Sequence, residues 1–190
     1  MKSRVTLLAF LLVLALSLGA QASINFIVNG GFETGDYTGW TSGGCGPAGV
    51  IGSGAGWLPN SGNYFSVEGA VGCDHTLSQT FSDIASQGLT ISFYYGSDGA
   101  SWNDINVYWN GNLIYGSFND PSTLPNYLLY TFNVTATGSD TLTIGIRNDP
   151  AYQALDDVSV TASTPEPGTL VLMGSGLLGL AGVVRRKFGV

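Results

Sequence analysis

Short runs in which apolar and polar residues alternate fill the middle of this 190-residue chain, and glycine, asparagine, aspartate and proline separate them. Alternation with a period of two is typical of strands that bury one face, whereas a helix would repeat its apolar positions every three or four residues. The pattern predicts nine strands, over residues 24–28, 64–68, 76–81, 89–95, 105–109, 113–118, 127–135, 141–147 and 154–161.

Two features between these runs predict how they connect. Asn110 and Gly111 separate two predicted strands, and both residues tolerate the positive φ that a type I′ hairpin requires. The glycine-rich segment 43–62 predicts a long loop. Eight or nine antiparallel strands over residues 23–163 fit an all-β fold, an antiparallel β-sandwich of the jelly-roll type.

The N-terminal end has the pattern of a secretory signal peptide. Lys2 and Arg4 precede an uncharged apolar run over residues 5–18, and Ala20-Gln21-Ala22 follows it. A short cationic start, an apolar run and small residues spaced A-x-A are typical of export and cleavage. We predict that residues 1–22 are removed after Ala22; an uncleaved membrane anchor is the alternative.

The C-terminal end combines three features. Pro165, Glu166 and Pro167 precede an uncharged run over residues 168–184, which the basic residues Arg185, Arg186 and Lys187 follow. As a helix this run would span roughly 25 Å at about 1.5 Å per residue, which is adequate for transient insertion into a bilayer. The trailing cations would stay in the cytoplasm.

This combination resembles the PEP-CTERM sorting signal of Gram-negative bacteria that produce exopolysaccharide. The resemblance implies that an exosortase, a membrane-bound protease of the transpeptidase type, cuts near residues 165–167 and passes the protein to the cell surface, the outer membrane or the extracellular matrix. Contact with the inner membrane would be transient. Residues 164–190 are thus expected to be a sorting signal, with a motif at 165–167, a helix at 168–184 and a basic tail at 185–190; a permanent single-pass anchor is the alternative.

The net charge of the chain's middle part excludes some classes of binding partner. The whole chain carries a net charge of −7, but between Ser23 and Thr164 one basic residue, Arg147, stands against twelve acidic ones, a net charge of −11. Phosphate binding needs a basic surface, so nucleic acid is not an expected partner. Anionic membrane surfaces are disfavoured for the same reason.

Two cysteines, Cys45 and Cys73, lie in the exported part. An even count in an oxidising compartment predicts a disulfide, which in the chain-entropy model would stabilise the fold by about 3.5 kcal/mol. A metal pair or a reactive thiol is the alternative, although His75 is the single histidine available to such a site.

Both ends of the predicted domain carry a second resemblance. Asn29-Gly30-Gly31-Phe32-Glu33, with Trp40 beyond it, opens the domain, and Leu155-Asp156-Asp157-Val158 closes it. These segments resemble the first and last strands of galactose-binding-like, carbohydrate-binding jelly rolls. The resemblance points to a structural Ca²⁺ site, with Glu33, Asp156, Asp157 and Asn29 as candidate ligands.

Simple physical arguments bear on that site. Two buried carboxylates repel each other unless a cation lies between them, and hard oxygen ligands suit Ca²⁺. Because side chains alternate along a strand, Asp156 and Asp157 are expected to face opposite ways, with Asp156 as the inward ligand. Solvated acids at strand ends are the alternative.

Sugar recognition would need an exposed aromatic side chain, because the C–H face of a pyranose stacks on an aromatic ring while amides and acids bind its hydroxyls. Trp57 and Trp102 lie among glycine, asparagine, serine and aspartate in predicted loops, so we expect both to be exposed ligand-binding residues. Trp109 and Tyr95 share strand faces with apolar residues and are expected in the core.

No catalytic motif stands out in the sequence. His75 has no serine or cysteine beside it in a nucleophile elbow and fits a polar strand end, and no spacing selects a pair among Glu68, Asp98 and Asp104 for glycoside cleavage. We therefore expect a non-catalytic exported protein that binds extracellular polysaccharide through its sandwich. A structural surface protein without a sugar ligand is the first alternative, and a polysaccharide hydrolase or lyase the second.

Overall fold

The computed structural model describes residues 24–162 and 174–176. Ile24–Ser163 forms one compact unit. The predicted signal peptide with Ala20 and Ala22, the motif Pro165-Glu166-Pro167 and the basic tail with Arg185, Arg186 and Lys187 lie outside the described residues. Of the predicted helix at 168–184, residues 174–176 are described, and they are helical. Within the described part of the chain, no helix has the length and apolar character needed to cross a membrane.

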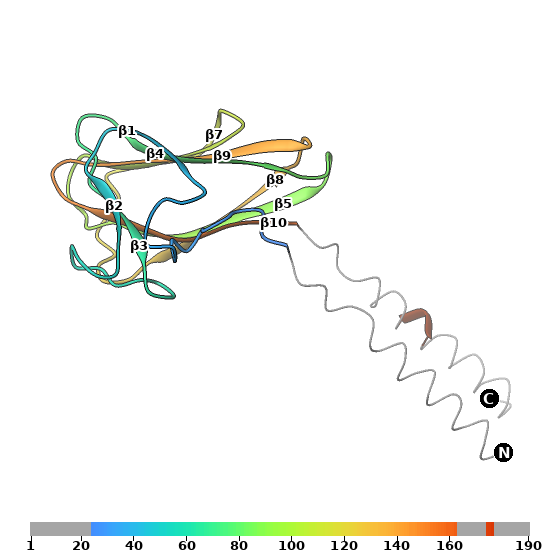
Figure 1. The fold of residues 1–190 in the computed structure, drawn as a ribbon, viewed down its shortest axis with the longest axis horizontal. Coiled ribbons are helices and arrows are strands. Elements are labelled where there is room, and N and C mark those ends of the chain that lie inside the picture. Colours follow the sequence, from blue (N-terminus) through green and yellow to red (C-terminus); the bar gives the residue numbers. More distant parts are fainter. Residues whose placement is uncertain (1–23, 163–173, 177–190) are drawn as a thin grey trace, which may run out of the picture. The chain divides into compact units, whose positions relative to one another are not determined.

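Two five-stranded antiparallel sheets pack against each other as two layers (Figure 1). The first sheet has the order β1 (Thr41–Gly44), β4 (His75–Ser82), β9 (Ser139–Asn148), β6 (Asn103–Trp109) and β7 (Asn112–Phe118). The second has the order β2 (Ala48–Ile51), β3 (Phe65–Glu68), β10 (Gln153–Ala162), β5 (Gly88–Gly96) and β8 (Leu128–Thr135). The predicted antiparallel β-sandwich is confirmed.

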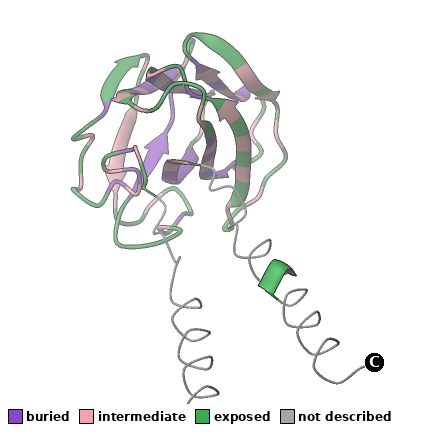
Figure 2. Ribbon diagram, turned by 90° about the vertical axis from the view of Figure 1, so that its right-hand side faces the viewer, coloured by how far each residue is buried: buried purple, intermediate pink, exposed green. Residues whose placement is uncertain are grey.

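Alternating burial along the strands builds the core between the sheets. β6 alternates buried and half-buried residues along its whole length, and β4 and β9 do so over most of theirs. In Figure 2 the buried residues gather in the strands, whereas the loops are largely exposed. Trp109 and Tyr95 belong to this core, as their strand faces predict. The hairpin prediction is also confirmed, since Asn110 and Gly111 join β6 to β7 with φ values of 51° and 77°.

The strand predictions fail at the N-terminal side of the domain. Residues 24–28 form no regular strand: Asn25 makes one isolated bridge to Thr161, and the side chain of Gln79 binds both the N–H and the C=O of Val28. In contrast, β1 overlaps the start of the segment 43–62 that the sequence predicts to be a loop, and β2 lies within it. Their residues are uniformly exposed or half-buried, so no alternation marks them.

The predicted disulfide is present. Cys45 and Cys73 are bonded across a sequence separation of 28 residues. Cys45 directly follows β1, and Cys73 lies two residues before β4. The bond therefore fixes the short edge strand β1 to its neighbour β4 at one end of the first sheet.

Candidate functional site

The outer face of the first sheet carries a row of residues without large side chains. The strand register places Gly43, Thr76, Gly145, Asn106 and Gly116 side by side across all five strands. Their neighbours along β4, β6 and β9 are buried in the core, so this row faces outward. Backbone and small polar groups are thus exposed or half-buried along this row except at Gly145, which is buried.

The next row toward one end of the sheet is charged and aromatic. Arg147 pairs with Asp104, and Asp104 pairs with Phe118 on β7. Asp74, just before β4, lies over Gly145: a Cβ at that glycine would be 2.7 Å from Oδ2 of Asp74. Only glycine leaves room there for the carboxylate.

Two carboxylates and an amide form a cluster on this face. Nδ2 of Asn106 donates to Oδ2 of Asp74 at 3.2 Å and to Oδ1 of Asp104 at 3.3 Å. Burial, and then the negative charge of Asp74, raise the pKa of Asp104 to about 6, although nearby Arg147 acts in the opposite direction. The cluster offers both acceptors and donors, the chemistry that hydroxyl groups require.

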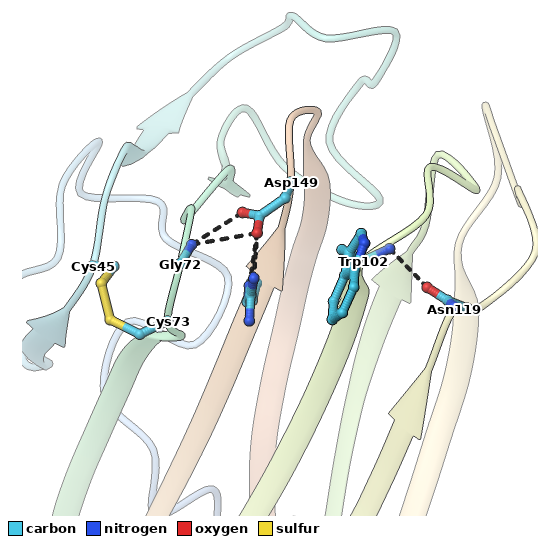
Figure 3. A network of polar contacts seen from close by, with 7 residues as sticks. Cys45, Gly72, Cys73, Trp102, Asn119 and Asp149 are labelled. Carbon is cyan, nitrogen blue, oxygen red and sulfur yellow. Dashed lines mark hydrogen bonds and ion pairs between the residues drawn. A yellow bond between two sulfur atoms is a disulfide. The ribbon is translucent and has the colours of Figure 1, made fainter.

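Trp102, two residues before Asp104 on the chain, lies beside this row, with 58% of its surface exposed. Its φ of 65° is unusual for a bulky residue, and two hydrogen bonds hold its backbone in place. The N–H of Trp102 donates to Oδ1 of Asn119 at 2.7 Å (Figure 3), and its C=O accepts from the N–H of Asp149 at 3.2 Å. The indole also meets the exposed ring of Phe118 edge-on, with centroids 5.8 Å apart.

A network of polar contacts supports the Trp102 ring from β9. The guanidinium of Arg147 lies 5.6 Å from the ring centroid and forms an ion pair with Asp149. The carboxylate of Asp149 in turn accepts from the N–H of Gly72 at 3.2 Å, next to the Cys45–Cys73 disulfide (Figure 3). The hydrogen bond from Arg147 holds the pKa of Asp149 below its ordinary value. The exposure predicted for Trp102 is confirmed, and an ion pair and hydrogen bonds link the residues around its ring.

The exposure predicted for Trp57 is wrong. Trp57 is 1% exposed and packs with Phe65 and Tyr127 in a second, smaller core. Its ring covers Gly96 of β5, where a Cβ would be 2.3 Å from the indole carbons. The segment before β3 folds over the outside of the second sheet, because the missing side chain of Gly96 leaves room for the indole of Trp57. Trp57 therefore offers no surface to a ligand.

The expected opposite orientation of Asp156 and Asp157 is also wrong. A bulge interrupts the β10–β5 register after Asp156, and Asp157 has a φ of 51°. Both carboxylates consequently bind the same segment: Oδ2 of Asp156 accepts from the N–H of Asn60 at 2.8 Å, and Oδ1 of Asp157 accepts from Oγ of Ser61 at 2.6 Å.

The two aspartates have no cationic side chain beside them. Within the described residues the ion pairs are His75–Glu68 and Arg147–Asp149. Asp156 is fully buried, and burial followed by the charge of Asp157 raises its pKa to about 7. Negative charge is therefore gathered here without a counter-charge from the protein.

Glu33 and Asn29 are engaged elsewhere in the same region. The carboxylate of Glu33 accepts from the N–H groups of Asn63 and Tyr64, and these bonds lower its pKa. The Asn29 side chain braces its own loop through Thr34 and the carbonyls of Asp36 and Thr38. In the part of the chain that is described, no three histidine, cysteine or acidic side chains form a group that could hold a metal ion. The oxygen chemistry suits Ca²⁺, but backbone carbonyls would have to complete its coordination.

Arg147, Asp104, Asn106 and Phe118 were not expected as site residues. Two sequence signals could have found them. Arg147 is the one basic residue between Ser23 and Thr164, and Asp104 and Asn106 alternate with apolar residues at the start of the predicted strand 105–109. Their grouping with Trp102 depends on the strand order, which the sequence pattern does not contain.

Comparison with known proteins identifies the C-terminal segment and the fold. The family model of the PEP-CTERM protein-sorting motif matches residues 163–187, as the sequence predicts. The motif indicates an exported protein sorted by an exosortase. No curated protein matches the chain.

Solved structures with the same fold include two carbohydrate-binding modules. TmCBM61, solved in complex with β-1,4-galactotriose, is 17% identical with a TM-score of 0.55, over 74% of this chain and all of that one. The CBM22-1 xylan-binding domain of Xyn10C from Paenibacillus barcinonensis is 16% identical with a TM-score of 0.51, over 77% of this chain and 99% of that one. The resemblance to carbohydrate-binding jelly rolls is confirmed for the fold.

A third similar structure is part of an enzyme. The enzymatically active domain of tailspike protein 4 from bacteriophage CBA120 is 13% identical with a TM-score of 0.56, over 74% of this chain. The match spans 22% of the length of that tailspike chain.

Proposed function

We propose that this protein is a carbohydrate-binding protein of the cell surface or exopolysaccharide matrix, and that it binds polysaccharide, without cleaving it, on the outer face of the first sheet. Exposed Trp102, whose backbone is hydrogen-bonded to Asn119 and Asp149 beside a polar row, carries the proposal. A pyranose ring stacked on its indole would place hydroxyl groups over Asp104, Asp74 and Asn106. Rigid aromatic side chains bind with little loss of conformational entropy.

The sorting signal supports the location. Processing by exosortase after transient contact with the inner membrane would deliver the domain to the outer surface of a Gram-negative cell, where polysaccharide is the abundant polymer. The domain's excess of acidic side chains favours a neutral glycan, since an anionic one would be repelled. A structural surface protein without a sugar ligand remains the second candidate, favoured by the exposed leucines Leu128 and Leu129 on edge strand β8.

We also propose that Ca²⁺ binds at the bulge of β10 and stabilises the domain. Asp156 and Asp157 would supply the charge, and Glu33 and Asn29 flank the segments that surround them. The absence of a neighbouring basic side chain among the described residues supports this assignment. The ion would tie the last strand to the segment around Asn60.

Glycan binding by the full-length chain in mild detergent tests the proposed function. Isothermal titration against oligosaccharides released from the producing strain's exopolysaccharide should show saturable binding. Trp102→Ala should weaken it about 5- to 150-fold, because stacking on one aromatic ring contributes on the order of 1–3 kcal/mol. Ile84→Ala, which removes an exposed apolar side chain from the loop after β4, is the matched control and should bind normally. Flat titrations for every oligosaccharide would favour the structural candidate.

A further inference from the structure

Three residues from three strands form a serine–histidine–glutamate arrangement beside the edge strand of the first sheet. Oγ of Ser42 lies 2.7 Å from Nε2 of His75, and Nδ1 of His75 lies 2.7 Å from Oε2 of Glu68. They come from β1, β4 and β3 respectively. We propose that Ser42 is an activated nucleophile that cleaves short acyl esters. This inference is independent of the glycan site, because Ser42 lies on the opposite face of β1 from Gly43.

The hydrogen bonds define a role for each group. An ionised Glu68 can only accept, so Nδ1 of His75 carries the proton, and Nε2 of the neutral imidazole is left to accept from the Ser42 hydroxyl. This is the relation of nucleophile, base and orienting carboxylate that serine hydrolases share on unrelated folds. The arrangement is recognised by its geometry, because no local sequence motif indicates it.

The nucleophile and its two supporting residues differ in how far they are exposed to solvent. Glu68 is 1% exposed and His75 is 6% exposed, whereas Ser42 is exposed on strand β1. The second oxygen of Glu68 accepts from Oγ of Ser66 at 2.5 Å and from the Tyr37 hydroxyl at 3.3 Å. These contacts fix the carboxylate against the imidazole, so the base is held in one orientation beside a serine of an exposed edge strand.

The edge position of β1 leaves room for a substrate and supplies a donor. The N–H of Cys45 donates to the C=O of Asp74 at 3.0 Å, which makes this a hydrogen-bonded pair of the ladder. Because such pairs alternate in antiparallel strands, the N–H of Ser42 points away from β4 toward the open edge. It can donate to the oxyanion of a carbonyl under attack. The flanking residues are Thr41 and Gly43, which offer no apolar surface for a long acyl chain.

The reaction balances with water as the second substrate. Oγ of Ser42 bonds to the carbonyl carbon of the ester, and its proton passes to Nε2 of His75. The C–O bond to the alcohol then breaks, and the leaving oxygen takes that proton. Water attacks the acyl-serine by the same route, which releases the carboxylic acid and regenerates Ser42. Glu68 stabilises the imidazolium in both steps.

A biotinylated fluorophosphonate, which bonds covalently to activated serines, tests the proposal on the full-length chain in mild detergent. Peptide mapping of the folded wild-type protein should place the adduct on Ser42. Ser42→Ala should lose the labelling, and its hydrolysis of p-nitrophenyl acetate should fall at least about 100-fold, the usual contribution of a positioned base. Glu68→Gln should slow both reactions, and Thr41→Ala, the matched neighbour on the other face of β1, should change neither.

Several results would overturn the assignment. One is the absence of an adduct on Ser42 in folded wild-type protein under conditions that fully label an authentic serine hydrolase. Another is labelling that spreads over other surface serines. A third is equal ester hydrolysis by wild type and Ser42→Ala. A melting curve accompanies each variant, because a purely structural hydrogen bond would lower the melting temperature of Ser42→Ala without any labelling of the wild type. Mapping on the wild type decides the matter even if a variant fails to fold.

Discussion

At the residue scale, two tryptophans with similar sequence surroundings differ in exposure: Trp57 is buried and Trp102 is exposed. Trp57 and Trp102 both lie among glycine and small polar residues. The difference comes from remote partners: Gly96 on β5 leaves a flat site that Trp57 covers, whereas Asn119 and Asp149 fix the backbone of Trp102 with its ring outward. No local pattern could predict either partner. The sequence therefore predicts the exposure of Trp102 correctly and that of Trp57 wrongly.

The pKa of Asp104 leads to a prediction on pH dependence. Burial and Asp74 raise this pKa from 3.8 to about 6, so the unfolded chain loses the proton at a lower pH than the folded domain does. The stability contributed by the protonated form is thus lost as pH rises through this range. Asp104→Asn should melt at a higher temperature than wild type at pH 7.5, and the advantage should shrink toward zero at pH 3.5.

The matched control for this experiment is an exposed aspartate with the opposite shift. Hydrogen bonds from Thr38 and Thr34 lower the pKa of Asp36, so Asp36→Asn should lose stability at pH 7.5. Melting temperatures followed by circular dichroism at both pH values measure both effects. If the Asp104→Asn difference were the same at pH 3.5 and pH 7.5, the raised pKa would be wrong.

At the element scale, the alternation rule succeeds in regular strands and fails where a strand is irregular. It predicts β4 to β9 and most of β10, because these strands pack buried or partly buried apolar side chains against the main core. It fails at the bulge, where one residue with positive φ turns Asp157 to the side of Asp156. It also misses β1 and β2, whose short glycine-containing sequences bury no single face.

The bulge gives the calcium proposal its test. A ligand that binds only the folded state at 100 times its dissociation constant stabilises that state by about 2.7 kcal/mol, which corresponds to roughly 5–10 °C in a domain of this size. The full-length chain should therefore melt at a higher temperature in Ca²⁺ than in chelator. Asp156→Asn should lose most of this gain, while Asp36→Asn keeps it. An unchanged wild-type melting temperature would contradict the proposal that Ca²⁺ binds at this bulge.

At the scale of the whole molecule, the C-terminal segment and the middle of the chain differ in character. Residues 163–187 match a protein-sorting motif, and the acidic middle forms the sandwich. Composition and motifs could predict this division because signal sequences are read locally. The candidate sites could not be predicted in the same way, since β1, β3, β4, β6 and β9 contribute residues that only the strand order brings together.

The central claim is that glycan binds at Trp102 on the outer face of the first sheet. The chain contains four tryptophans, so its indole N–H signals form a small, resolvable set in an NMR spectrum of the ¹⁵N-labelled protein. Titration with oligosaccharides from the producing strain's exopolysaccharide should shift the Trp102 signal, assigned with Trp102→Ala, in a saturable manner. The signal of Trp57, buried against the second sheet, should not move. A saturable shift at Trp57 with none at Trp102 would contradict the account.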